Sequence, residues 1–185
     1  MTYLNYTDKN FYLVIKQLLL NNGKKMELGR GDFLCQTGDI TSKLGILVSG
    51  MLKYSITATN GRERIVSFAF TGDLVGSYSC MRQNTTSLLD IVATESSIIY
   101  QLPVEQIDAA IGLEYRMKLS EALCYQMLKS TVDNYCQSPE ERYLALTERF
   151  PDIHNRMTNR IIASYLGITP ESLSRLRKRL LTKQQ

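Results

Sequence analysis

The stretch NRIIASYLGITPESLSRLRKRL, residues 159–180, predicts two short helices joined by a sharp turn. Gly167 suits the positive φ that ends a helix, and Thr169 followed by Pro170 is typical of a helix start. Three leucines of the second helix recur every three or four residues and so face one buried side: Leu173, Leu176 and Leu180. Together these signals predict a helix–turn–helix.

The opposite side of the second helix is polar and basic. Its first two turns are the part of a recognition helix that reaches base edges in the major groove, and Glu171, Ser172 and Arg175 lie there. Arg175 can donate two hydrogen bonds to guanine, and Glu171 can accept one from cytosine. Lys178 and Arg179 suit phosphate, which contributes affinity rather than sequence information. The predicted DNA-binding residues are Arg160, Thr169, Glu171, Ser172, Arg175, Lys178 and Arg179.

Charge is spread unevenly along the chain. Residues 156–185 hold seven basic residues and one acidic residue, whereas the rest holds 15 basic and 17 acidic residues. A cationic end on a near-neutral body indicates a polyanion as the partner of that end alone, and together with the helix–turn–helix signals it predicts double-stranded DNA. The alternatives are a solvated basic helix, or a ligand-binding or protein-interaction module whose last domain does not read DNA.

Composition argues against several other classes of protein. Cys35, Cys80, Cys124 and Cys136 form no CxxC pair, and the single histidine, His154, is isolated. Neither a zinc nor an iron–sulfur site has its usual ligand spacing, so we predict no metal, no cofactor, no catalytic residue and no enzyme activity. No apolar run reaches the roughly 18 residues of a membrane span, and the first ten residues lack a signal peptide's features. We therefore expect a cytoplasmic protein with no membrane partner.

Turn residues are frequent between positions 25 and 100, which predicts many short antiparallel strands in a barrel or jelly roll. Asn60-Gly61 suits a type I′ hairpin. The strand that follows should have two faces, one with Arg64, Val66, Phe68 and Phe70 and the other with Ile65, Ser67 and Ala69.

Helices are predicted on both sides of these strands. An amphipathic helix spans residues 8–22, and a long one spans about 104–135, with Gly112 as a candidate break. The long helix has two apolar seams, so it either pairs two protomers or packs on its own roll, and periodicity leaves both open. For a homodimer the predicted interface residues are Leu119, Leu123 and Met127.

Ser138-Pro139 reads as the start of a further helix, and we place the last domain boundary there. The expected division is a roll over 1–112, a dimerisation helix and linker over 113–138, and a helix–turn–helix domain over 139–185. The fold class is thus α+β: an antiparallel β-roll or jelly roll, a long helix, and a small helical domain without an evident wing.

This order of parts resembles the CRP/FNR family of bacterial transcription regulators. The resemblance covers nearly the whole chain and rests on GDFLCQTGD (31–39), ILVSGMLK (46–53), NGRERIVSFAFTGDLVGS (60–77) and IIASYLGITPESLSRLRK (161–178). It implies a roll like that of cyclic-nucleotide-binding proteins, a dimerisation helix and a DNA-reading domain, with Glu171 and Arg175 at the family's base-reading positions.

The resemblance also locates an effector pocket, where this chain departs from the members that bind cyclic AMP. Those members have a Gly-Glu pair for the ribose and an arginine for the cyclic phosphate. Here Gly72-Asp73 replaces the first, and residues 83–95 contain no arginine for the second, although Arg82 is close in sequence. A buried phosphate without a guanidinium partner is costly, so we expect a sensor with an unidentified small-molecule effector and no response to cyclic AMP. The candidate pocket residues are Gly72, Asp73, Leu74, Arg82, Thr86 and Ser87.

Overall fold

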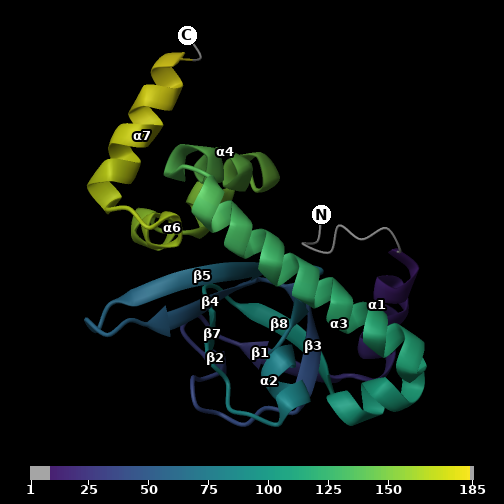
Figure 1. Cartoon of the computed structure of the whole chain (residues 1–185). Coiled ribbons are helices and arrows are strands. Elements are labelled where there is room, and N and C mark those ends of the chain that lie inside the picture. Colours follow the sequence, from purple (N-terminus) through teal and green to yellow (C-terminus); the bar gives the residue numbers. More distant parts are fainter. Residues whose placement is uncertain (1–8, 184–185) are drawn as a thin grey trace.

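The computed structural model describes residues 9–183, which form a two-sheet β-roll with helices before and after it (Figure 1). The predicted first helix is α1 (Lys9–Asn22), and its expected start at residue 8 lies outside the described residues. Helix α1 lies beside the long helix α3 (Val104–Cys136) on one side of the roll. The last four helices lie near the carboxyl end of α3 (Figure 1).

Each sheet of the described chain has four antiparallel strands, which confirms the predicted roll. The first contains, in spatial order, β1 (Lys24–Leu28), β8 (Ser97–Pro103), β3 (Lys43–Ser49) and β6 (Leu74–Val75). The second contains β2 (Phe33–Cys35), β7 (Asp90–Ala93), β4 (Met51–Thr57) and β5 (Glu63–Phe70). Strand β5 is therefore one edge of the second sheet, and β2 is the other. The apolar core of the roll includes the fully buried side chains of Leu47, Leu52, Ile91 and Ile99.

The turn between β4 and β5 differs from the predicted type I′ turn. Gly61 has a φ of 74°, but Asn60 keeps a negative φ. The Gly61 N–H donates to the Ala58 carbonyl oxygen (2.8 Å), and the Ala58 N–H donates to that of Arg62 (2.9 Å). This is a type I turn followed by a left-handed glycine, the usual three-residue hairpin loop. Asn-Gly is compatible with both turns, so the sequence alone does not separate them.

A bulge at Val66 also changes the predicted faces of β5. Because the extra residue shifts the alternation by one, Ile65 joins Phe68 and Phe70 in one apolar cluster, whereas Ala69 packs inside the roll. The expectation that Ile65 lies opposite the two phenylalanines is therefore wrong.

The long helix α3 has the expected break at Gly112, whose φ of 73° and ψ of 176° interrupt the helical backbone. Beyond the break, Leu119 and Ala122 pack against α1 and the roll, in a cluster with Phe11 and Ile15. A six-residue helix, α2 (Tyr78–Gln83), follows β6 and was not predicted.

The carboxy-terminal part is entirely helical in the described residues. A capping box between Ser138 and Glu141 starts it, which confirms the predicted helix start. The short α5 was not predicted. The four helices are α4 (Pro139–Arg149), α5 (Ile153–Arg156), α6 (Asn159–Leu166) and α7 (Pro170–Lys183).

Candidate functional site

Helices α6 and α7 form the predicted helix–turn–helix. The Thr158 side chain accepts from the Ile161 N–H at the start of α6. Gly167 ends α6 with φ 71° and ψ 24°, and the next N–H, from Ile168, donates to the Ala163 carbonyl oxygen (3.0 Å). These bonds satisfy the last carbonyls of α6 and turn the chain sharply, as a left-handed glycine permits.

The inner side of α7 is apolar, as the leucine spacing predicts. Leu173 and Leu176 are buried and Leu180 is half-buried. They pack against α6, where Ile162 and Leu166 are also buried. This packing fixes which side of α7 faces outward.

At the amino-terminal end of α7, Ser172 contacts two further polar residues, Thr169 just before the helix and Arg175 one turn later. The Ser172 N–H donates to the Thr169 hydroxyl oxygen (3.2 Å), and an Arg175 guanidinium N–H donates to the Ser172 Oγ (3.1 Å). Glu171 is exposed, and its own backbone N–H followed by the Thr169 hydroxyl lowers the pKa of its carboxyl. A charged acceptor and a guanidinium donor thus stand one turn apart on an exposed helix face.

The other predicted cations have different surroundings. Arg160 and Lys178 are exposed. Arg179 forms an ion pair with Glu140 of α4, so a phosphate contact from Arg179 requires exchange of that partner. Arg177, which was not predicted, donates to the Asn159 Oδ1 (3.3 Å) and so ties α7 to the start of α6.

The helix–turn–helix is docked on the roll, a relation that the sequence did not predict. The Ser164 Oγ accepts from the Ile65 N–H (3.3 Å) and donates to the Glu63 carbonyl oxygen (3.2 Å), two backbone groups on the edge strand β5. The Phe70 and Phe150 rings stack with centroids 3.4 Å apart. Arg156 also pairs with Glu95, with an N–O distance of 2.5 Å. One apolar cluster therefore contains residues of both the roll and helices α4–α7.

A cavity of about 800 Å³ lies between the roll and α3. Of the six predicted pocket residues, Asp73, Leu74 and Arg82 line this cavity, whereas Gly72, Thr86 and Ser87 do not. Ser87 is buried, and its hydroxyl donates to the Leu89 carbonyl oxygen (2.8 Å), so its side chain is bonded within its own loop. Sequence reasoning missed the lining that comes from α3, because that helix is distant in sequence; it includes Cys124, Met127, Leu128 and Thr131.

The two charged groups predicted for the pocket are already engaged. The Asp73 carboxylate accepts from the Phe70 N–H (2.9 Å) and so closes its own turn. Arg82 makes two hydrogen bonds to the carboxylate of Asp108, one of 2.5 Å, and its guanidinium lies 5.0 Å from the Tyr78 ring centroid. The Asp108 hydrogen bond is the main reason that the pKa of Arg82 is raised.

The two seams of α3 face different surroundings. Leu119, predicted for a dimer interface, is 1% exposed within its own protomer, and Leu123 is half-buried against the same cluster. This burial contradicts the role predicted for Leu119, since a residue filling its own core cannot meet a partner. Met127 is 62% exposed. The exposed apolar residues of α3 are Leu113, Met117, Tyr125, Met127, Leu128, Val132 and Tyr135.

Residues 9–183 show neither a metal-binding cluster nor a membrane span. No group of three or more His, Cys, Asp and Glu side chains is arranged to hold a metal ion there. None of the helices in that range is both long and apolar enough to span a bilayer.

Known proteins resemble this arrangement. Residues 25–112 match the family described as the cyclic nucleotide-binding domain. The chain is 25% identical over 173 residues to the anaerobic regulatory protein of Pasteurella multocida, a match that covers 85% of this chain and 63% of that protein. It is 28% identical over 170 residues to the fumarate and nitrate reduction regulatory protein of Escherichia coli, covering 83% and 67%.

A solved structure, that of FixK2 from Bradyrhizobium japonicum, matches with a TM-score of 0.72 at 18% identity, over 88% of this chain and 86% of that one. This likeness concerns the fold. The chain spans about two thirds of the length of the curated relatives that it matches.

Proposed function

We propose that the chain is a regulator of the CRP/FNR family: a homodimeric, sequence-specific DNA-binding transcription regulator that acts in the cytoplasm. The observation that carries the proposal is the polar face of α7. Its inner side is fixed by Leu173 and Leu176, so Glu171 and Arg175 are exposed on the outer side, and Ser172 is half-buried beside them.

Base selection is assigned to Glu171 and Arg175. The guanidinium of Arg175 can reach guanine with two donors, and the Glu171 carboxylate, held charged by hydrogen bonds, can accept from a cytosine amino group. Arg160, Lys178 and Arg179 are assigned to phosphate, which positions the helix without selecting sequence.

Selection of binding sites from random duplex DNA tests this assignment. The wild type should yield a two-fold symmetric consensus, and Glu171→Ala with Arg175→Ala should abolish the preference at the bases that these residues read, at about 1–3 kcal/mol for each base. Lys178→Ala is the matched control, because it should weaken binding to all sequences alike. An unchanged consensus in the double variant would remove the base-reading role.

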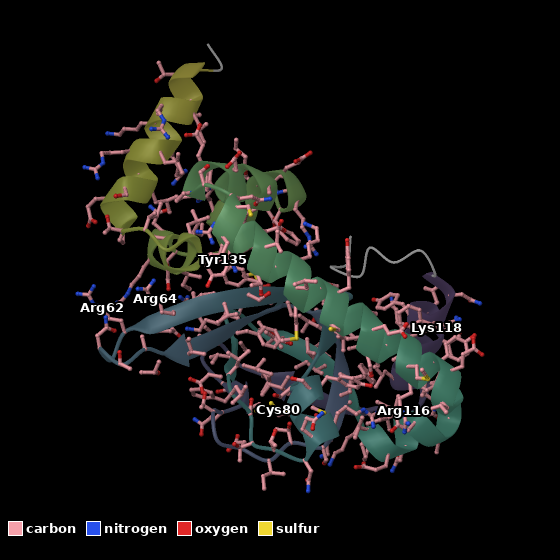
Figure 2. The ribbon with its side chains drawn as sticks, viewed as in Figure 1. Arg62, Arg64, Cys80, Arg116, Lys118 and Tyr135 are labelled. Atoms are coloured by element: carbon pink, nitrogen blue, oxygen red, sulfur yellow. The ribbon has the colours of Figure 1, made fainter. Side chains whose placement is uncertain are left out.

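The proposed dimer uses the exposed seam of α3. Met117, Cys124, Leu128 and Tyr135 recur along the helix at spacings close to those of a coiled coil, and Tyr135 is 88% exposed (Figure 2). Pairing this seam in two protomers would hold two reading helices at a fixed separation, as half-sites one helical turn apart require.

Sedimentation or native mass spectrometry measures this association. Leu128→Asp with Tyr135→Asp should give a monomer, since two charges would lie in the seam. Leu88→Asp is the control, because Leu88 is 72% exposed on the roll. A double variant that remains dimeric would place the interface elsewhere.

We assign the cavity to an effector without a cyclic phosphate. Arg82 is the one cation among its described lining residues, and Asp108 and Tyr78 occupy it, while the Asp73 carboxylate would repel a phosphate. Millimolar cyclic AMP should therefore leave the melting temperature unchanged. A ligand at 100 times its dissociation constant would add about 2.7 kcal/mol, so a clear saturable rise would contradict this assignment.

A further inference from the structure

The β4–β5 hairpin carries two exposed arginines at its free end, Arg62 and Arg64 (Figure 2). Within residues 9–183, no acidic side chain pairs with either guanidinium. The acid between them, Glu63, accepts from the Lys53 Nζ (2.5 Å) and the Ser55 hydroxyl (2.9 Å). The hairpin end is therefore cationic, because its acidic residue, Glu63, is neutralised by Lys53 of β4.

The loop that holds these arginines is well ordered by its own hydrogen bonds. Besides the turn bonds at Ala58 and Gly61, the Arg62 N–H donates to the Asn60 Oδ1 (3.1 Å). Arg64 lies at the start of β5 and Arg62 stands directly before that strand, so the two exposed side chains are only two residues apart at the hairpin end. A fixed backbone lowers the entropic cost when such side chains bind an anion.

The hairpin is also attached to the reading helices. Ser164 of α6 bonds to the backbone of Glu63 and Ile65, the two residues that flank Arg64. One residue later, the Tyr165 ring lies 5.1 Å from that of Phe68. The position of the arginines relative to α6 and α7 is therefore set by direct contacts.

Further positive charge lies near this junction. Arg160 is exposed and stands one helical turn before Ser164, on the same face of α6. In the view of Figure 1, the free end of the hairpin and the amino-terminal end of α7 project toward the same side of the molecule. The basic surface of the reading domain thus extends onto the roll.

We propose that Arg62 and Arg64 bind phosphates of the DNA beside the bases that α7 reads, so that the hairpin acts as a second element that binds the DNA backbone. This inference rests on the proposed function. Phosphate binding of this kind adds affinity and salt dependence equally for every sequence, because phosphates do not vary with the bases.

Binding is measured by fluorescence anisotropy with a duplex carrying the selected site and with a scrambled duplex, at salt concentrations from about 50 to about 200 mM. Arg62→Ala with Arg64→Ala should weaken both duplexes by the same factor. The slope of log K against log salt should become shallower by about 0.9 for each phosphate that is no longer neutralised, or by about 3.6 for a dimer in which four arginines are replaced. Arg62→Lys with Arg64→Lys should restore the slope.

Arg30→Ala is the matched control, because Arg30 is an exposed arginine in the turn before β2, the opposite edge of the same sheet. Its salt slope should equal that of the wild type. If the wild type selects a site but the double alanine variant shows the same slope of log K against log salt as the wild type, this inference is overturned and the proposed function stands. Loss of transcription with unchanged DNA binding would assign the hairpin to an acidic protein partner, and would also overturn it. If the wild type binds neither duplex, the proposed function itself fails.

Discussion

Replacing Phe70 by alanine tests whether the roll and the reading helices share one core. Phe70 is 4% exposed at the end of β5, and its ring stacks on Phe150 at an interplanar angle of 18°. The Arg149 guanidinium also lies 5.9 Å from the ring centroid. A buried Phe→Ala change costs about 3–5 kcal/mol, and loss of an aromatic pair adds about 0.5–1.5 kcal/mol. This is a large part of the roughly 5–15 kcal/mol that stabilises a typical domain.

The measurement is urea unfolding followed by far-ultraviolet circular dichroism, since the chain has no tryptophan. The cluster that contains Phe70 joins strands of the roll to α4–α7. Phe70→Ala should therefore lower the urea midpoint of unfolding and also separate unfolding into two steps. Phe33→Ala is the matched control, because Phe33 is 44% exposed on β2, and it should cost about 1 kcal/mol or less. Equal losses of stability for the two variants, with one transition in each, would refute a shared core.

Three further predictions concern local structure. Burial, followed by the nearby Arg177, lowers the pKa of His154 below 6.5. The stability that the neutral imidazole contributes is therefore complete above pH 6.5 and is lost as the pH falls below that value. Urea midpoints measured from about pH 8 to about pH 5 should fall more for the wild type than for His154→Gln. Gly167→Ala should cost about 1–2 kcal/mol in the same urea assay, since alanine must adopt a φ of 71°, and a cost near zero would mean that the turn rearranges. Ser138→Ala should cost about 1 kcal/mol by removing the capping box with Glu141, whose carboxyl pKa is lowered mainly by the Ser138 N–H; unchanged unfolding would show that the cap does not stabilise α4.

The reading helices could be predicted from sequence because their signals are local. Gly167 ends one helix, Thr169 with Pro170 starts the next, and both act within a few residues of their own positions. The strands of the roll could be predicted as a class for a similar reason, since turn residues mark where each one ends. The order of the strands and the bulge at Val66 depend on pairing between distant segments, and no local signal specifies them.

The pocket residues were harder to predict, because only their positions in the family's sequence motif indicated them. Asp73 and Arg82 do line the cavity, yet their charges are used by Phe70 and Asp108, partners that lie outside the motif. Ser87 lies in the expected segment but turns into its own loop. A pattern can place a residue near a site, but the state of its side chain depends on neighbours that the pattern does not contain.

The two seams of α3 show why one helix serves two purposes. Leu119 and Ala122 hold its middle in the core with α1, whereas Met127 and Leu128, further along the helix, border the cavity and are exposed. A ligand in the cavity would therefore touch the seam through which we propose that two protomers pair. The same helix ends just before the capped start of α4, so a change in how the two protomers pair would alter the distance between their two α7 helices. A ligand would act here by favouring one dimer arrangement over another, to the extent that it binds the two with different affinity.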